Sequence, residues 1–348
     1  MIELGISTFG ETTEIEGTGV APKHDQRIRD MIEEMKLADE VGLDVYAIGE
    51  HHREDFAVSA PEILLAAGAS VTKNIRLSSA VTVLSSSDPV RVYQQYATID
   101  AISNGRSEVM VGRGSFTESF PLFGYDLADY EELFDEKLEM LDKIKNNEKL
   151  TWEGKHTQSV LDKGVYPRAI QEDFPIWVAT GGNVESTVKI AQKGFPIAYA
   201  IIGGEYRRFK GLIDYYKAIG RNAGYSEDKL KVASHSWGFI ADTDEEAINK
   251  YFHPTKQVVD AISKDRPFWS PLTFEQYLNS VGPEGSMLVG SPETVANKLI
   301  DMIETLNLDR FLLHLPLGSM PHEDIMKSIK LFGEEVAPKV RAHFNKSK

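Results

Sequence analysis

The chain has 348 residues, of which 42% are hydrophobic and 26% charged, and this composition predicts a soluble globular protein with a large core. Its 53 acidic and 38 basic side chains give a formal charge of −15, which argues against nucleic acid and anionic membranes as partners because both attract clustered cations. The absence of cysteine excludes disulfides and thiolate-ligated metals, and without a secretory signal or a long apolar run the expected location is the cytoplasm.

Short segments of β-type sequence alternate with amphipathic helical patterns along the chain. The expected strands cover residues 2–7, 44–48, 75–84, 107–111, 175–179, 196–202, 230–240 and 310–315. Strands that alternate with helices indicate a parallel sheet, because a parallel connection needs a crossover that a helix supplies. Eight such units in 348 residues predict an α/β fold of the (β/α)₈ TIM-barrel type.

Two stretches interrupt this alternation. Residues 148–174 follow the fourth expected strand, and residues 251–290 follow the seventh and mix aromatic side chains with proline, glycine and serine. Long irregular segments in a compact domain are often lids or binding loops. We therefore expect residues 1–348 to form one domain with two insertions, the second being either an active-site lid or an extra subdomain.

The densest cluster of titratable side chains is Glu50-His51-His52, which follows the second expected strand. Carboxylate and imidazole groups could bind a metal, act as an acid–base site, or satisfy a turn. In extended backbone Glu50 and His52 point to one side and His51 to the other, so one ion rarely collects all three. This alternation favours an acid–base role for His51.

Gly112-Arg113-Gly114 follows the fourth strand and begins like a dinucleotide-binding motif. The motif fails because Thr117 stands where its third glycine belongs. An arginine between glycines still suits an anion, since the guanidinium can clamp a phosphate and the glycines let the ligand approach. The alternative is a surface arginine that pairs with a nearby acid.

The turn Thr180-Gly181-Gly182-Asn183 joins the fifth strand to a helix that contains Ser186. Paired glycines before a helix N-terminus expose backbone N–H groups and form a natural phosphate cradle. The alternative is a tight turn capped by Asn183. Because Arg113 and this turn both follow strands at the same end of the barrel, they are expected to form two halves of one phosphate pocket.

Taken together, these segments resemble the bacterial luciferase-like flavin monooxygenases over nearly the whole chain. The ordered motifs are Glu50-His51-His52, Ser79-Ala80-Val81, Asp88-Pro89-Val90-Arg91, Ser103-Asn104-Gly105-Arg106, Gly112-Arg113-Gly114, Gly181-Gly182, Gly290-Ser291-Pro292-Glu293-Thr294-Val295 and the closing helix at 328–338. The resemblance implies a TIM barrel that binds reduced FMN at the carboxyl ends of its strands.

Carried over by position, the resemblance assigns His51 as the catalytic histidine and Arg113 with the 181–186 turn as the phosphate holder. It places the family's non-prolyl cis peptide, which lies against the isoalloxazine ring, at Ala80-Val81. The full set of expected cofactor-binding residues is Glu50, Ala80, Val81, Gly112, Arg113, Thr180, Gly181, Gly182, Asn183 and Ser186. Glu50 and His52 are also expected to brace the loop that carries His51.

The implied activity is a two-component monooxygenase that uses O₂ and FMN reduced by a separate flavin reductase, acting on an aldehyde or another small organic substrate. Gly112 and Gly181-Gly182 replace side chains of luciferase itself, which favours a general oxidoreductase over a light emitter. The alternatives are a deazaflavin-dependent hydride-transfer enzyme, a non-catalytic flavin-binding partner subunit and a metal-dependent hydrolase. A homodimer is expected through the small-residue helix at 60–70.

Overall fold

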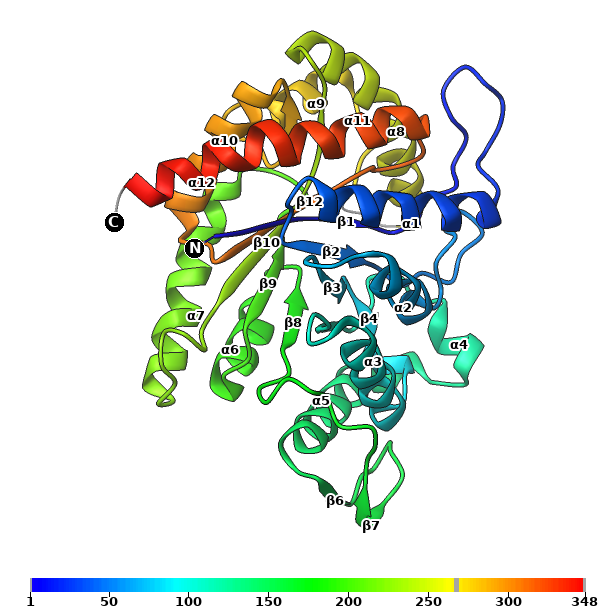
Figure 1. Ribbon diagram of the computed structural model, residues 1–348, viewed down its shortest axis with the longest axis vertical. Helices are drawn as coiled ribbons and strands as arrows, with labels where there is room; N and C mark the ends of the chain where they lie inside the picture. Colours follow the sequence, from blue (N-terminus) through cyan, green and yellow to red (C-terminus); the bar gives the residue numbers. More distant parts are fainter. Residues whose placement is uncertain (1, 266–268, 347–348) are drawn as a thin grey trace.

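The centre of the molecule is a parallel sheet rolled into a barrel, seen in a computed structural model that describes residues 2–265 and 269–346 (Figure 1). The barrel strands are β1 (Glu3–Thr8), β2 (Val45–Ile48), β3 (Arg76–Ser79), β4 (Thr82–Val83), β5 (Val109–Gly112), β8 (Ile176–Thr180), β9 (Ile197–Ala200), β10 (Val232–Ile240) and β12 (Arg310–His314). Each of the expected strand segments therefore contains a strand of the structure.

The barrel closes through β3 and β4, which occupy a single position between β2 and β5. The strand order is β3-β2-β1-β12-β10-β9-β8-β5-β4. Strand β3 pairs with β2 and β4 pairs with β5, and a parallel bridge from Leu77 to Ser107 joins β3 to the segment before β5. The peptide bond between Ala80 and Val81, which separates β3 from β4, is cis. The (β/α)₈ fold is confirmed.

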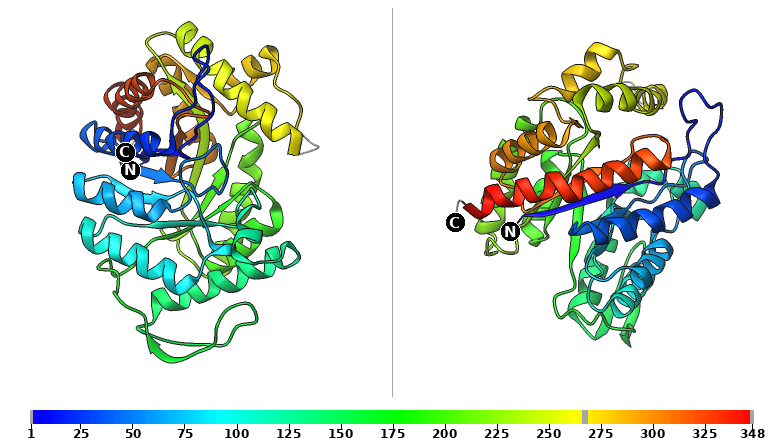
Figure 2. Two further views of the ribbon diagram at one scale, coloured as in Figure 1. Left: turned by 90° about the vertical axis from the view of Figure 1, so that its right-hand side faces the viewer. Right: turned by 45° about the horizontal axis from the view of Figure 1, so that its top comes forward.

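Helices cover the outside of the barrel (Figures 1 and 2). They are α1 (His24–Glu40), α2 (Pro61–Val71), α3 (Pro89–Ser103), α4 (Ser119–Phe123), α5 (Tyr130–Asn146), α6 (Val184–Lys193), α7 (Lys210–Asn222), α8 (Asp244–Asp265), α9 (Phe274–Val281), α10 (Pro292–Leu306), α11 (His322–Leu331) and α12 (Ala337–Lys346). Helix α3 shows how the sequence sets a boundary, because Asp88 accepts hydrogen bonds from the Val90 and Arg91 amides. Among the described residues, no helix is long and apolar enough to cross a membrane.

The first insertion forms an antiparallel hairpin, β6 (Lys149–Trp152) and β7 (Val160–Gly164), which stands at the bottom of Figure 1. The second was expected to be irregular, and this expectation is wrong for most of its length. Helix α8 continues to Asp265 and α9 follows, because aromatic side chains at helical spacing pack on the core: Tyr251 stacks on Phe239 with ring centroids 5.7 Å apart. Residues 266–268 of this insertion lie outside the described residues.

An ion-paired cluster occupies the amino end of the barrel. Arg310, the first residue of β12, has a side chain that is 2% exposed and pairs with Glu108, which is 1% exposed. Its Nε also donates to Glu3 Oε2 at 2.8 Å, and its guanidinium lies 4.4 Å from the centroid of the Trp177 ring. The charges are thus buried as a hydrogen-bonded set, which is how proteins tolerate them in a core.

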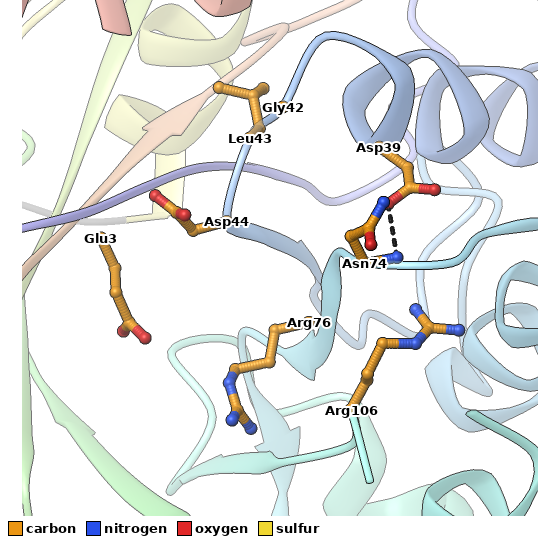
Figure 3. A pocket seen from close by; sticks show the side chains of 8 residues that line it. All are labelled: Glu3, Asp39, Gly42, Leu43, Asp44, Asn74, Arg76 and Arg106. Carbon is orange, nitrogen blue, oxygen red and sulfur yellow. Dashed lines mark hydrogen bonds between the residues drawn. The ribbon is translucent and has the colours of Figure 1, made fainter. Parts of the chain in front are cut away.

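A cavity opens beside this cluster, at the amino ends of β1, β2 and β3 (Figure 3). Its charged side chains serve the local backbone: Asp39 accepts from the amides of residues 73–75 at 2.7 to 2.8 Å. Arg106 donates to the carbonyl oxygens of Ile75 at 2.6 Å and Thr72 at 3.0 Å. This end of a TIM barrel typically serves stability, and the carboxyl ends of the strands carry the chemistry.

Candidate active site

Small side chains line one side of the barrel's carboxyl end. The interior cluster contains Val45, Ala47, Ala80, Met110, Trp177, Ala198, Ala233 and Leu312, one or two from each of several strands. Since side chains alternate along a strand, the next inward positions toward the carboxyl ends are Gly49, Gly112, Ala179 and Ala200 on one side. On the other side the same rule places His235 and His314. The inward positions are therefore small residues on the first side and imidazoles on the second.

Glu50 and His52 face each other, as strand alternation predicts. The Nε2 atom of His52 donates to Glu50 Oε1 at 2.8 Å, and the Val83 amide donates to Glu50 Oε2, also at 2.8 Å. One carboxylate oxygen of Glu50 therefore holds β4 beside the Ala80-Val81 peptide, and the other orients His52. The three residues of the cluster do not converge on one point, since His51 is directed elsewhere.

His51 lies in a cage of phenyl rings. It stacks on Phe56 with centroids 4.4 Å apart, and the edges of Phe9 at 4.6 Å and Phe116 at 5.1 Å close the cage. The side chain is 8% exposed. Burial lowers the pKa of His51 to about 3, so its imidazole is neutral at physiological pH. A neutral imidazole can accept a proton at one ring nitrogen and donate a proton from the other.

Arg113 and Ser186, predicted as two halves of a phosphate pocket, are brought together. One Nη atom of Arg113 donates to Ser186 Oγ, in the first turn of α6, and the other pairs with Glu131 of α5. Asn183 caps α6 by accepting from the Ser186 amide at 2.7 Å. The sequence left two alternatives for Arg113, a phosphate pocket and a pair with a nearby acid, and the pair with an acid is present in the structure. No sequence pattern identified Glu131 as that acid.

The turn before α6 is open to solvent at Gly181. Gly182 has φ +97°, a conformation that glycine adopts without strain, and its amide donates to Thr180 Oγ1 at 3.3 Å. A Cβ added to Gly181 would meet nothing within 4 Å, so a ligand has space to approach the chain there. Lys189 and Lys193 line the same small cavity as Arg113, and Asp135, which also lines it, pairs with Lys189 at 2.9 Å.

Sequence analysis missed a second group of polar side chains beyond Phe9. His314 lies 3.0 Å from Glu11 through Nε2, lies 3.3 Å from Ser7 Oγ through Nδ1, and stacks on His235 with ring centroids 4.9 Å apart. The alternation of inward-facing and outward-facing side chains along β10 and β12 could have predicted that both histidines face the barrel interior. No motif marks Glu11, because it follows β1 in a loop and meets His314 only through the closure of the barrel.

Known proteins share this architecture. N-acetyl-S-alkylcysteine monooxygenase of Bacillus subtilis is 27% identical over 81% of this chain and 85% of its own length. A monooxygenase from Streptomyces bottropensis superposes with a TM-score of 0.84 at 21% identity, over 97% of this chain and 99% of its own.

Two other solved structures of similar fold contain a bound cofactor or cofactor adduct. The oxygenating constituent of 3,6-diketocamphane monooxygenase from Pseudomonas putida, solved with FMN, has a TM-score of 0.74 at 22% identity and covers 97% of this chain and 98% of its own. An F420-dependent secondary alcohol dehydrogenase has a TM-score of 0.75 at 18% identity and covers 98% of this chain and 99% of its own. The luciferase-like monooxygenase family matches residues 2–309, and the chain belongs to that family.

Proposed function

We propose that this protein is an FMN-dependent monooxygenase that receives reduced FMN from a separate reductase and oxygenates an aldehyde or another small organic substrate with O₂. The observation that carries the proposal is the contact of Arg113 with Ser186 at the N-terminus of α6, beside a barrel mouth lined by small side chains. A guanidinium and a helix N-terminus together suit the phosphate of the cofactor.

The residues present fit FMN at each end. Arg113, Ser186 and the Thr180–Asn183 turn would hold the phosphate, and the Ala80-Val81 segment with Gly112 would lie under the ring. Reduced FMN, when bound, supplies the electrons with which O₂ is activated. His51 enters as a neutral imidazole that takes up or delivers a proton at its ring nitrogens, and the phenyl rings of Phe9 and Phe56 exclude water around it.

The cofactor proposal is tested with two variants of one ion pair. Arg113→Ala is expected to weaken binding of reduced FMN by roughly 10- to 100-fold, the effect of losing a charge-assisted hydrogen bond. Glu131→Gln breaks the same pair but keeps the cation, so its affinity should stay equal or rise. Anaerobic titration monitored by flavin absorbance measures both; equal weakening in the two variants would show that Arg113 only supports the fold.

A deazaflavin is the second candidate cofactor, because a structural neighbour is F420-dependent. Competitive titration of reduced FMN against F420 distinguishes the two, and stronger binding of the deazaflavin would replace the oxygenase by a hydride-transfer enzyme. A non-catalytic partner subunit would bind flavin and consume no O₂ with any substrate. The presence of both His51 in its phenyl cage and Arg113 favours an enzyme.

The protein partners remain proposals. A separate reductase is proposed because the sequence has no convincing nicotinamide motif. A homodimer is proposed through α2, whose outer face carries Ile63 at 63% and Val71 at 46% exposure. A lid role for the segment that contains α8 and α9 is also proposed.

A further inference from the structure

Ser7, His314 and Glu11 form a buried row joined by two hydrogen bonds. Two arrangements of the protons keep both hydrogen bonds. In the first, the Glu11 carboxylic acid donates to His314 Nε2, and Nδ1–H donates to Ser7 Oγ. In the second, Ser7 donates to Nδ1, Nε2–H donates to Glu11 Oε1, and the acid proton sits on Glu11 Oε2. The whole unit is neutral in both. It can therefore present Oε2 either as an acceptor or as a donor without creating a charge.

Two polar atoms of this group have no partner among the described residues: Glu11 Oε2 and His235 Nε2. Glu11 is 1% exposed, so Oε2 has no access to bulk water. A buried polar atom without a hydrogen bond costs about 1–3 kcal/mol, and such atoms usually mark the place of a ligand or a bound water.

The surroundings keep the group uncharged. Burial raises the pKa of Glu11 to about 8, against the opposing effects of the backbone of Glu11 and Phe9 and of the Arg27 charge, and lowers the pKa of His314 to about 3. The pKa of His235 is also lowered, by burial and by its neighbour His314. Arg27 is itself neutralised by Glu34, whose Oε1 lies 2.5 Å from its Nη1. A charged ligand would therefore find no partner charge in this group.

We propose that Glu11 Oε2 and His235 Nε2, with His314 positioning Glu11, form a hydrogen-bonding subsite for an uncharged carbonyl or hydroxyl oxygen of the substrate. The proposal deepens the proposed function, because the occupant is the substrate of that same site. The ring of Phe9, partly exposed, lies between this subsite and His51: its centroid is 4.3 Å from that of His314 and 4.6 Å from that of His51. An apolar body with one neutral oxygen matches this combination, whereas a carboxylate or sulfonate does not.

The first test compares neutral, apolar and charged probes on the full-length chain by isothermal titration calorimetry, with and without saturating FMN. Cyclohexanone and acetophenone are paired with methylcyclohexane and ethylbenzene, and benzoate is the charged probe. At least one ketone is expected to bind about tenfold more tightly than its hydrocarbon and than benzoate, the effect of one hydrogen bond. A purely apolar pocket would give the reverse order, because a carbonyl loses its hydration there.

His235→Phe keeps the ring and removes the nitrogens, so it should abolish the ketone preference; Glu11→Leu is the second variant. His343→Phe, at a half-buried site on α12 where the imidazole pairs with Glu304, is the matched control and should retain the preference. No preference in the wild-type protein, or a preference that survives in both His235→Phe and Glu11→Leu, overturns the subsite. If FMN does not bind but the ketone preference holds, the proposed function fails and the subsite stands.

A second test needs no ligand. The folded protein keeps the Glu11 proton up to about pH 8, whereas the unfolded chain releases it near the ordinary glutamate pKa of 4.5, so this group lowers stability as the pH rises between these values. The variant compared with the wild type changes Glu11 alone. The other titratable groups around Glu11 stay the same in both proteins: Arg27 and Glu34 on α1, Tyr46 on β2 and His314 on β12.

In Glu11→Gln this pH dependence is absent. The urea midpoint of the wild type is therefore expected to fall relative to Glu11→Gln as the pH is raised from about 5 to about 8. The exposed Glu14→Gln variant in the same loop is the control. A constant difference between wild type and Glu11→Gln would mean that Glu11 is ionised in the folded protein, and would overturn the neutral subsite.

Discussion

His51→Ala is expected to lower kcat by roughly 10²- to 10⁴-fold, the contribution that a positioned acid–base group makes. The affinity for reduced FMN should be unchanged, because the proposed phosphate holder, Arg113, follows β5 whereas His51 follows β2. Steady-state turnover with externally supplied reduced FMN, combined with anaerobic FMN titration, measures the two quantities separately.

The neighbouring residue provides the matched control for His51. His52→Ala removes the hydrogen bond to Glu50 and should act through the position of the loop, with a smaller loss of kcat. Burial lowers the pKa of His51 to about 3. The pH profile of the wild-type kcat should therefore show no step from this group near the ordinary histidine pKa of 6.5. Full turnover in His51→Ala would remove the residue from the mechanism.

Glu108→Gln is expected to destabilise the fold by about 3–5 kcal/mol, because it leaves the buried Arg310 guanidinium without its main partner. Burial alone would raise the pKa of Glu108, but the adjacent Arg310 outweighs it and the net pKa is lowered. A carboxylate with a lowered pKa contributes stability at neutral pH that is lost as the pH falls. Urea unfolding followed by circular dichroism measures the free energy.

A double variant separates pairing from burial at this cluster. Glu108→Leu with Arg310→Met removes both charges, and the free energy of unfolding should recover much of the loss, because well-packed apolar side chains replace a buried ion pair at little cost. A double variant as unstable as Glu108→Gln would contradict this explanation. It would assign the effect to packing on the Trp177 ring, which contacts Arg310.

Local sequence signals predicted the strands because their causes are local. Asp88 and Pro89 mark the start of α3, and the hydrogen bonds of Asp88 to the next amides need only residues close in the chain. The same reasoning was wrong for 251–290. Proline and glycine near aromatic side chains suggested a loop, but burial of Tyr251 and Tyr277 against the core favours helix over much of the segment.

The predicted site was found in parts. Alternation along the chain after β2 correctly placed Glu50 with His52 and apart from His51, because it depends only on backbone geometry. The contact of Arg113 with Ser186 followed from both segments ending strands at the same barrel face. Glu131, which shares Arg113, lies on a helix surface where an acidic residue is ordinary, so nothing in the sequence singled it out.

The sequence by itself determined the alternation of strands and helices, the position of His51 after the second strand and the glycine-rich turn before α6. Each of these depends on residues a few positions apart. Only the tertiary structure decided that Ser7 and Glu11 meet His314, more than 300 residues away in the chain. The reason is the closure of the barrel: β1 pairs with β12 in a register that sets Ser7 against His314.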